Sequence, residues 1–151
     1  MRYSDEPVEN PNSLSLDIYP TDVENSPVIV YVHGGGWWRG TKDSVDEKPA
    51  AFNSNGFVFV SVNYRLIPEV DIAQEVRDVA AAIAWVKRNI AQHGGDPKRI
   101  FLMGHSAGAH LVSLIGTDGS YLEAEGLSLA DIKGVISLDT QAYYLKTLLT
   151  N

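Results

Sequence analysis

Residues 99–115 read RIFLMGHSAGAHLVSLI, and this stretch decides the fold. Its first part, 99–103, is a short apolar run of the kind that forms a buried strand. Its last part, 107–115, is almost wholly apolar and long enough for a buried helix. Only three residues lie between the two parts. The chain must therefore turn very tightly from a strand into a helix.

The sequence on either side of this stretch predicts more strands and one long helix. The runs at 28–32 and 57–62 are continuous β-branched and aromatic sequence, which is typical of strands buried on both faces of a parallel sheet. Residues 71–91 carry apolar side chains at spacings of three and four, which indicates a helix. Residues 13–19 alternate as a half-exposed strand does, and 135–138 form the last clear strand. This order predicts the α/β class, with a mostly parallel, doubly wound sheet.

One domain accounts for the whole chain of 151 residues. Residues 1–12 are polar and contain two prolines, so we expect an N-terminal arm. Residues 13–151 carry all the predicted strands and helices, and no internal repeat or linker divides them. We therefore expect an arm at 1–12 and a single partial domain at 13–151.

The composition excludes several classes of function. The formal net charge is −7, and an acidic chain repels the phosphate backbone of nucleic acids. The absence of cysteine excludes disulfides and a thiol nucleophile. No histidines and carboxylates have the spacing of metal ligands, so we expect no metal. The polar N-terminus lacks a secretory signal and no segment is apolar enough to span a bilayer, so we expect a soluble, cytoplasmic protein without a membrane partner.

The turn at 104–108 has the pattern G-x-S-x-G between a strand and a helix. In so tight a turn Ser106 adopts a strained backbone conformation, and its hydroxyl is exposed at the carboxyl end of the sheet. Small residues at 104 and 108 keep the strand and the helix from clashing. The N–H of Ala107, at the start of the helix, points to where an oxyanion would form. These features indicate nucleophilic catalysis by Ser106.

A glycine-rich loop, His33-Gly34-Gly35-Gly36-Trp37, follows the first buried run. Successive glycines let backbone N–H groups approach a substrate carbonyl without interference from side chains. The loop lacks the Lys-Ser/Thr pair of a phosphate-binding P-loop. It therefore favours the second half of an oxyanion hole.

Together these motifs resemble the α/β-hydrolase superfamily, in particular the serine esterases of the hormone-sensitive-lipase, carboxylesterase and arylformamidase-like types. The resemblance implies that Ser106 is the nucleophile and that the N–H groups of Gly35, Gly36 and Ala107 form the oxyanion hole. It implies that Trp37 lines the substrate pocket and that no cofactor is needed. The segments that carry the resemblance are 33–37, Val62-Asn63-Tyr64-Arg65-Leu66, Gly95-Asp96-Pro97-Lys98-Arg99-Ile100 and 104–108.

The same resemblance implies a catalytic acid and a catalytic histidine, and both are missing from their usual places in the chain. The family's order along the chain is Ser, acid, His. The acid usually follows the strand after 135–138, and the histidine follows the next one. Neither strand is found before Asn151, so we expect a truncated α/β-hydrolase fold that lacks its last strands. Asp139, at the end of the last predicted strand, is the candidate acid. None of the four histidines is a convincing base for Ser106.

Two functions remain in competition. The first is a serine esterase that hydrolyses small carboxylic esters through an acyl-enzyme on Ser106, weakly because the acid and the histidine are missing. The second is a non-catalytic half-domain that self-associates. In either case the last strand would be an open sheet edge, and we expect a homo-oligomer formed through it. A dinucleotide-binding fold is disfavoured because the first strand–helix turn lacks G-x-G-x-x-G.

Overall fold

The computed structural model describes residues 1–140. These residues form five strands and four helices, with short 3₁₀ turns at Pro11–Leu14, Ile90–His93 and Leu129–Asp131. The elements in chain order are β1 (Leu16–Tyr19), β2 (Ser26–Val32), α1 (Lys48–Ser54), β3 (Val58–Val62), α2 (Ile72–Asn89), β4 (Gly95–His105), α3 (Ala107–Thr117), α4 (Ser120–Glu123) and β5 (Ile132–Leu138).

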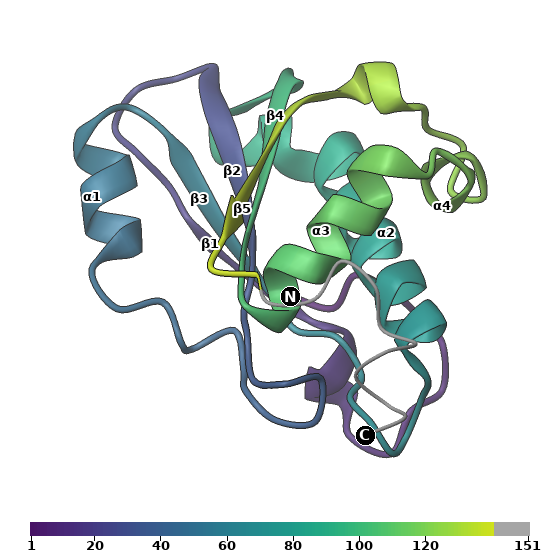
Figure 1. Ribbon diagram of the computed structural model, residues 1–151. Coiled ribbons are helices and arrows are strands. Elements are labelled where there is room, and N and C mark those ends of the chain that lie inside the picture. The colour runs from purple at the N-terminus through teal and green to yellow at the C-terminus, as the bar shows by residue number, and fades with distance from the viewer. Residues whose placement is uncertain (141–151) are drawn as a thin grey trace.

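The five strands form a single sheet in the order β1-β3-β2-β4-β5. Strands β3, β2, β4 and β5 run parallel, and β1 joins the edge of β3 antiparallel. Helix α1 covers one face of the sheet, and α2, α3 and α4 lie on the other (Figure 1). The mostly parallel, doubly wound α/β architecture is therefore confirmed. Parallel strands end at the same edge, so the loops that follow β2 and β4 meet there.

Alternate residues of the central strands fill two separate cores. Val30, Val60 and Leu102 face the larger core, beneath α2 and α3. Their neighbours Tyr31 and Phe59 face the smaller core, beneath α1. All five side chains are almost fully buried, which is why these strands read as unbroken apolar runs.

The bounds of the elements differ modestly from the sequence expectation. The predicted helix at 71–91 is α2, and Asp71 is its N-cap, accepting a hydrogen bond of 2.8 Å from the N–H of Gln74. The predicted strand at 99–103 extends through Gly95–His105, because pairing with β2 continues beyond the apolar run. The short helix α4 has no apolar periodicity that would have predicted it.

The N-terminal residues pack against this framework. Tyr3 is buried and its hydroxyl donates a 2.8 Å hydrogen bond to the carbonyl oxygen of Asn63. Arg2 forms an isolated antiparallel bridge with Ser15. The carboxylate of Glu6 accepts two hydrogen bonds from Arg65. The first residues thus brace the segment that follows β3.

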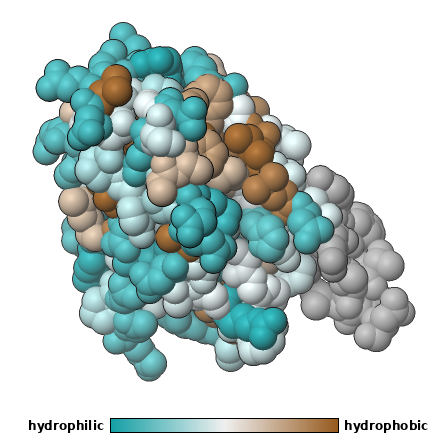
Figure 2. Space-filling view, turned by 90° about the vertical axis from the view of Figure 1, so that its left-hand side faces the viewer, coloured by the Kyte–Doolittle hydropathy of each residue, from teal (hydrophilic) through white to brown (hydrophobic). Residues whose placement is uncertain are grey.

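Strand β5 is the outer strand on the side of the sheet opposite β1. Val135, Ile136 and Leu138 each leave more than a third of their surface exposed. Figure 2 shows brown, apolar atoms gathered to the right of centre; the front of Figure 1, where β5 lies, faces right in this view. Within residues 1–140 this edge has no strand partner beyond β4. In the same residues no helix is both long and apolar enough to cross a membrane.

Candidate active site

The turn between β4 and α3 holds Ser106 in a strained conformation, with φ 53° and ψ −117°. A side chain rarely occupies this region, and such strain is typical of functional sites. The close packing around the turn explains the two glycines. A Cβ atom at Gly104 would lie 2.3 Å from the carbonyl oxygen of Gly108, and one at Gly108 would lie 2.1 Å from the carbonyl oxygen of Val32. Only glycine fits at either position.

Backbone hydrogen bonds hold this turn on both sides. The N–H of Ser106 donates to the carbonyl oxygen of Leu138 at 2.9 Å, which ties the turn to the end of β5. The carbonyl of Ser106 accepts from the N–H of His110 at 3.1 Å, which starts α3. The side chain of Ser106 is partly exposed, and its hydroxyl makes no hydrogen bond within residues 1–140. Ser106 is therefore rigidly held and accessible.

The glycine loop lies directly against this turn. A Cβ atom at Gly34 would be 3.1 Å from the Cβ of Ser106 and 2.8 Å from the carbonyl oxygen of His105. Gly35 and Gly36 have φ values of 131° and 64°, which favour glycine. Their N–H groups donate no hydrogen bond to any other described residue. Ala107 is the first residue of α3, so its N–H has no partner one helical turn back. These three backbone N–H groups are thus free to donate hydrogen bonds to a ligand beside Ser106, as far as the described residues go.

The residues that follow β3 pack against His33, the first residue of the glycine loop. The ring of His33 stacks on Tyr64 with centroids 4.5 Å apart, and the Tyr64 hydroxyl donates to the His33 carbonyl at 2.9 Å. Burial lowers the pKa of His33, and its Nδ1 lies 2.7 Å from the carbonyl oxygen of Gly34. Next along the chain, Arg65 binds the buried carboxylate of Asp78 on α2. Tyr64 and Arg65 thus connect the glycine loop and α2 to the segment after β3 through buried contacts.

The two tryptophans after the glycines have different surroundings. Trp37 packs against the larger core, with its ring edge-on to His110 at 5.7 Å, and its Nε1 is buried without a partner in residues 1–140. Trp38 is 61% exposed, and the guanidinium of Arg39 lies over its ring at 4.9 Å. The Trp37 ring thus lies between the glycine loop and α3.

The four histidines lie at different places around the sheet. His33 and His110 are buried, and burial lowers the pKa of each. His93 lies in the turn before β4, at the sheet edge opposite Ser106. His105 is exposed, with its Nε2 3.9 Å from the carboxylate of Asp139. None of the four imidazole rings is hydrogen-bonded to the Ser106 hydroxyl in the part of the chain described.

Asp139, the candidate acid, directly follows the residue that accepts the Ser106 N–H. It has a φ of 53°, and its side chain is 75% exposed. The structure therefore brings Asp139 to the same sheet edge as Ser106 and the glycine loop. Its nearest histidine is His105, inside the turn itself. A contact between His105 and Asp139 that is 3.9 Å long and this exposed to solvent contributes little to the stability of the fold.

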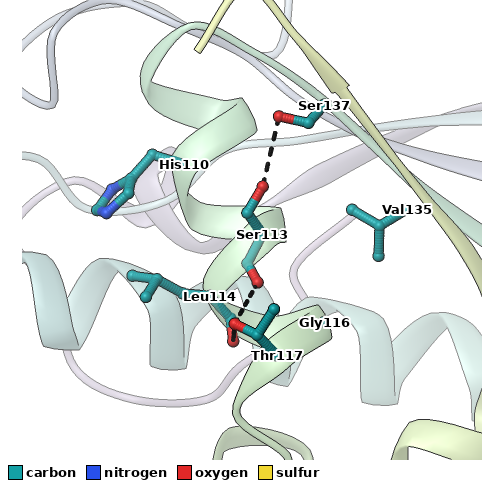
Figure 3. A pocket seen from close by; sticks show the side chains of 7 residues that line it. All are labelled: His110, Ser113, Leu114, Gly116, Thr117, Val135 and Ser137. Atoms are coloured by element: carbon teal, nitrogen blue, oxygen red, sulfur yellow. Dashed lines mark hydrogen bonds between the residues drawn. The ribbon is translucent and has the colours of Figure 1, made fainter. Parts of the chain in front are cut away.

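A pocket of about 320 Å³ lies between α3 and β5. Ser113 on α3 reaches Ser137 on β5 across a 3.4 Å hydrogen bond, with His110 to one side and Val135 to the other (Figure 3). The pocket opens beside the exposed edge strand. Apart from the two serines, Thr117 and His110, its lining is apolar: Leu114, Gly116 and Val135.

Helix α2 carries a buried carboxyl group, Glu75, in its first turn. Glu75 is fully buried, and neither oxygen has a side-chain or backbone hydrogen bond in the described structure. Burial raises the pKa of Glu75 to about 8, and the charge of nearby Asp78 contributes in the same direction. The signal in the sequence was that positions 75 and 78 fall within the apolar stripe of the helix.

Glu75 predicts a loss of stability as the pH rises. The unfolded chain releases this proton near pH 4.5, whereas the folded chain keeps it to about pH 8. The unfolded state is therefore favoured increasingly across this window. We expect the free energy of unfolding, measured with urea between pH 5 and 8, to fall by roughly 3 to 4 kcal/mol more in the unmodified chain than in Glu75→Gln. Parallel curves for the two proteins would contradict the assignment.

Within residues 1–140 no three histidines, aspartates or glutamates cluster as metal ligands do.

The family model BD-FAE matches residues 16–141. The chain is 37% identical over 119 residues to a probable isoprenylcysteine alpha-carbonyl methylesterase of Arabidopsis thaliana, covering 79% of this chain and 28% of that protein. It is 41% identical over 97 residues to carboxylesterase NlhH of Mycobacterium tuberculosis, covering 64% and 30% respectively.

Among solved structures, the fold is similar to esterase B from Lactobacillus rhamnosis. The TM-score is 0.73 at 29% sequence identity, and the match covers 89% of this chain and 45% of the esterase. The chain thus spans less than half of that esterase and about a third or less of the two enzymes above.

Proposed function

Because the chain belongs to the BD-FAE family and has the fold of the α/β-hydrolase esterases, we propose that it carries the nucleophile and oxyanion hole of a serine esterase. One observation carries this proposal. The strained, accessible Ser106 lies against a glycine loop whose N–H groups have no other partner in the described residues. The names of the relatives, a methylesterase and a carboxylesterase, support carboxylic esters as the substrate class.

In the proposed reaction the Ser106 oxygen attacks the ester carbonyl carbon and loses its proton to a base. The N–H groups of Gly35, Gly36 and Ala107 bind the oxyanion that forms. The C–O bond to the alcohol then breaks, the alcohol leaves with a proton, and the acyl group stays on Ser106. Water hydrolyses this second ester and restores the serine. No cofactor takes part in these steps.

The base is the part of this mechanism that residues 1–140 do not supply. No histidine ring among them is hydrogen-bonded to the Ser106 hydroxyl, and Asp139 is an acidic group at the same edge of the sheet as Ser106. We infer that the base comes from polypeptide outside these residues. Without it, hydrolysis is expected to be slow, because the oxyanion hole and binding alone give roughly 10³–10⁴-fold over water.

An organophosphate with a 4-nitrophenolate leaving group tests the nucleophile directly. Its phosphorus would form a bond to the Ser106 oxygen, 4-nitrophenolate would leave, and the serine proton would pass to solvent. We expect one phosphoryl adduct per chain in the intact mass and its location at Ser106 by peptide fragmentation. Labelling spread over several serines, or no adduct after prolonged reaction, would contradict an activated Ser106.

The open edge of β5 favours a second candidate role, a self-associating half-domain without turnover. Edge strands with exposed apolar side chains and unpaired backbone groups pair readily with other strands. Val135, Ile136 and Leu138 form such an edge. An antiparallel pair of β5 strands centred on Ile136 would place Lys133 of one copy opposite Asp139 of the other, a favourable cross-strand pair.

We expect Ile136→Lys to convert a dimer into a monomer, because two like charges would meet at the centre of this pair. The measurement is sedimentation velocity at micromolar concentrations. Val23→Lys is the matched control, since Val23 is also exposed but lies far from β5 in the sequence and outside every strand. A monomeric unmodified chain, or a dimer that persists in Ile136→Lys, would rule out association through this edge.

A further inference from the structure

A second hollow, of about 360 Å³, adjoins the candidate nucleophile on the α1 side of the sheet. Gly34 and Gly35 form one wall and His105, the residue before Ser106, forms another. A Cβ atom at Gly34 would lie 3.1 Å from the Cβ of Ser106, so the same residue borders both the hollow and Ser106. A ligand group in this hollow would therefore lie within a few bonds of an ester carbonyl held at Ser106. The remaining lining residues are Tyr31, Arg39, Gly40, Ser44, Asp46 and Lys48.

Two cationic side chains, Arg39 and Lys48, and the carboxylate of Asp46 line this hollow, and the Asp139 carboxylate lies 3.9 Å from the Nε2 of His105. The Arg39 guanidinium lies over the Trp38 ring, and no carboxylate in residues 1–140 pairs with it. The Lys48 ammonium lies 3.4 Å from a carboxylate oxygen of Asp46, whose side chain is 86% exposed. Such an exposed contact neutralises Lys48 only weakly. By contrast, Lys42 and Arg65 are paired with Asp17 and Asp78 in better-buried contacts.

The shape of the hollow suits a small group with a charged end. The Lys48 ammonium lies 5.2 Å from the centre of the Tyr31 ring, so an apolar surface and a cation face the same space. Ser44 adds a hydroxyl donor at the rim. In a chain with net charge −7, two weakly neutralised cations beside the nucleophile are a local exception.

We propose that this hollow binds a carboxylate carried by the ester substrate, and that the esterase therefore prefers anionic esters. The inference rests on the proposed function, because it places the scissile carbonyl at Ser106. Arg39 and Lys48 are its specificity-determining residues. They hold the carboxylate and take no part in bond breaking.

Two matched esters test this preference. 4-Nitrophenyl hydrogen adipate and 4-nitrophenyl hexanoate have acyl chains of equal length, and only the first ends in a carboxylate. We expect kcat/KM to favour the adipate in the unmodified chain, after subtraction of the Ser106→Ala rate. The ratio of adipate to hexanoate should fall about fivefold in Arg39→Gln and again in Lys48→Gln, the scale of a partly exposed ion pair. It should also fall at high salt.

Arg99→Gln is the control. Arg99 lies in the first half of β4, away from the end of the strand at His105, and its guanidinium pairs with Asp96. This substitution should leave both the ratio and the basal hydrolysis unchanged. A ratio near one in the unmodified chain, or a ratio unaffected by Arg39→Gln and Lys48→Gln, would overturn the proposal.

Binding of the adipate dianion itself separates this inference from the proposed function. We expect titration into Ser106→Ala to shift the amide NMR signals of Gly34, Gly35 and His105, with weaker binding in the same background carrying Arg39→Gln. Shifts without hydrolysis of either ester would support the hollow and contradict the esterase. Hydrolysis of the hexanoate without shifts would support the esterase and overturn the hollow.

Discussion

Ser106→Ala is expected to abolish the acyl adduct that the unmodified chain forms with a short-chain 4-nitrophenyl ester. Alanine removes the hydroxyl oxygen that would form the covalent bond, while the backbone N–H groups around the turn remain. The pre-steady-state burst of 4-nitrophenolate should disappear with the adduct. Intact mass and rapid kinetics on the same samples measure both.

The size of the change in turnover then reports on the base. With a base within reach of Ser106, the substitution should lower kcat by about 10³-fold or more. Without one, the two steady-state rates should be similar, because the oxyanion hole acts in both proteins. Ser113→Ala is the control, since Ser113 lies on the next turns of α3 and bonds to the Ala109 carbonyl. Absence of burst and adduct in the unmodified chain would show that the turn is not catalytic.

Asp78→Ala is expected to destabilise the fold by about 3 kcal/mol, because it leaves the Arg65 guanidinium buried without its principal partner. The two side chains are 9% and 3% exposed, and their shortest contact is 2.6 Å. Glu6 still binds Arg65 from the partly exposed side, so the loss should lie at the lower end for a buried pair. Urea unfolding followed by far-UV circular dichroism measures it.

Asp71→Ala provides the comparison on the same helix. It removes the N-cap hydrogen bond to Gln74 and should cost about 1 kcal/mol. The double variant Asp78→Leu with Arg65→Met should recover much of the stability lost in Asp78→Ala, because no buried charge then remains. A cost for Asp78→Ala no greater than that for Asp71→Ala would show that Arg65 does not depend on the buried pair.

The local sequence was enough to predict the sheet, the long helix and the tight turn. The unbroken apolar runs of β2 and β3 follow from burial on both faces, and the spacing of glycines around Ser106 follows from contacts closer than 2.5 Å. Contacts between distant segments were not predictable in this way. The stack of His33 on Tyr64 and the pair of Arg65 with Asp78 join residues that have no sequence periodicity in common.

The candidate site shows the same division. The positions of Ser106 and the glycine loop follow from two short motifs, each placed after a strand. The surroundings of Trp37 and the burial of Glu75 depend on how α2, α3 and the loop pack together. A charged residue in the apolar stripe of a helix signals such burial, but it does not identify the partner.

The hydrogen bond from the Ser106 amide to the Leu138 carbonyl links the turn at Ser106 to the exposed edge strand β5. Edge strands open by local unfolding at a lower free energy than central ones. When β5 detaches, the amide of Ser106 loses its acceptor although β2 and β4 stay paired. In hydrogen–deuterium exchange, this amide should therefore exchange together with β5 and faster than the amides of Val30 and Leu102. Local opening of the edge strand then determines how well Ser106 is ordered, and any molecule that covers β5 would also slow the motion of Ser106.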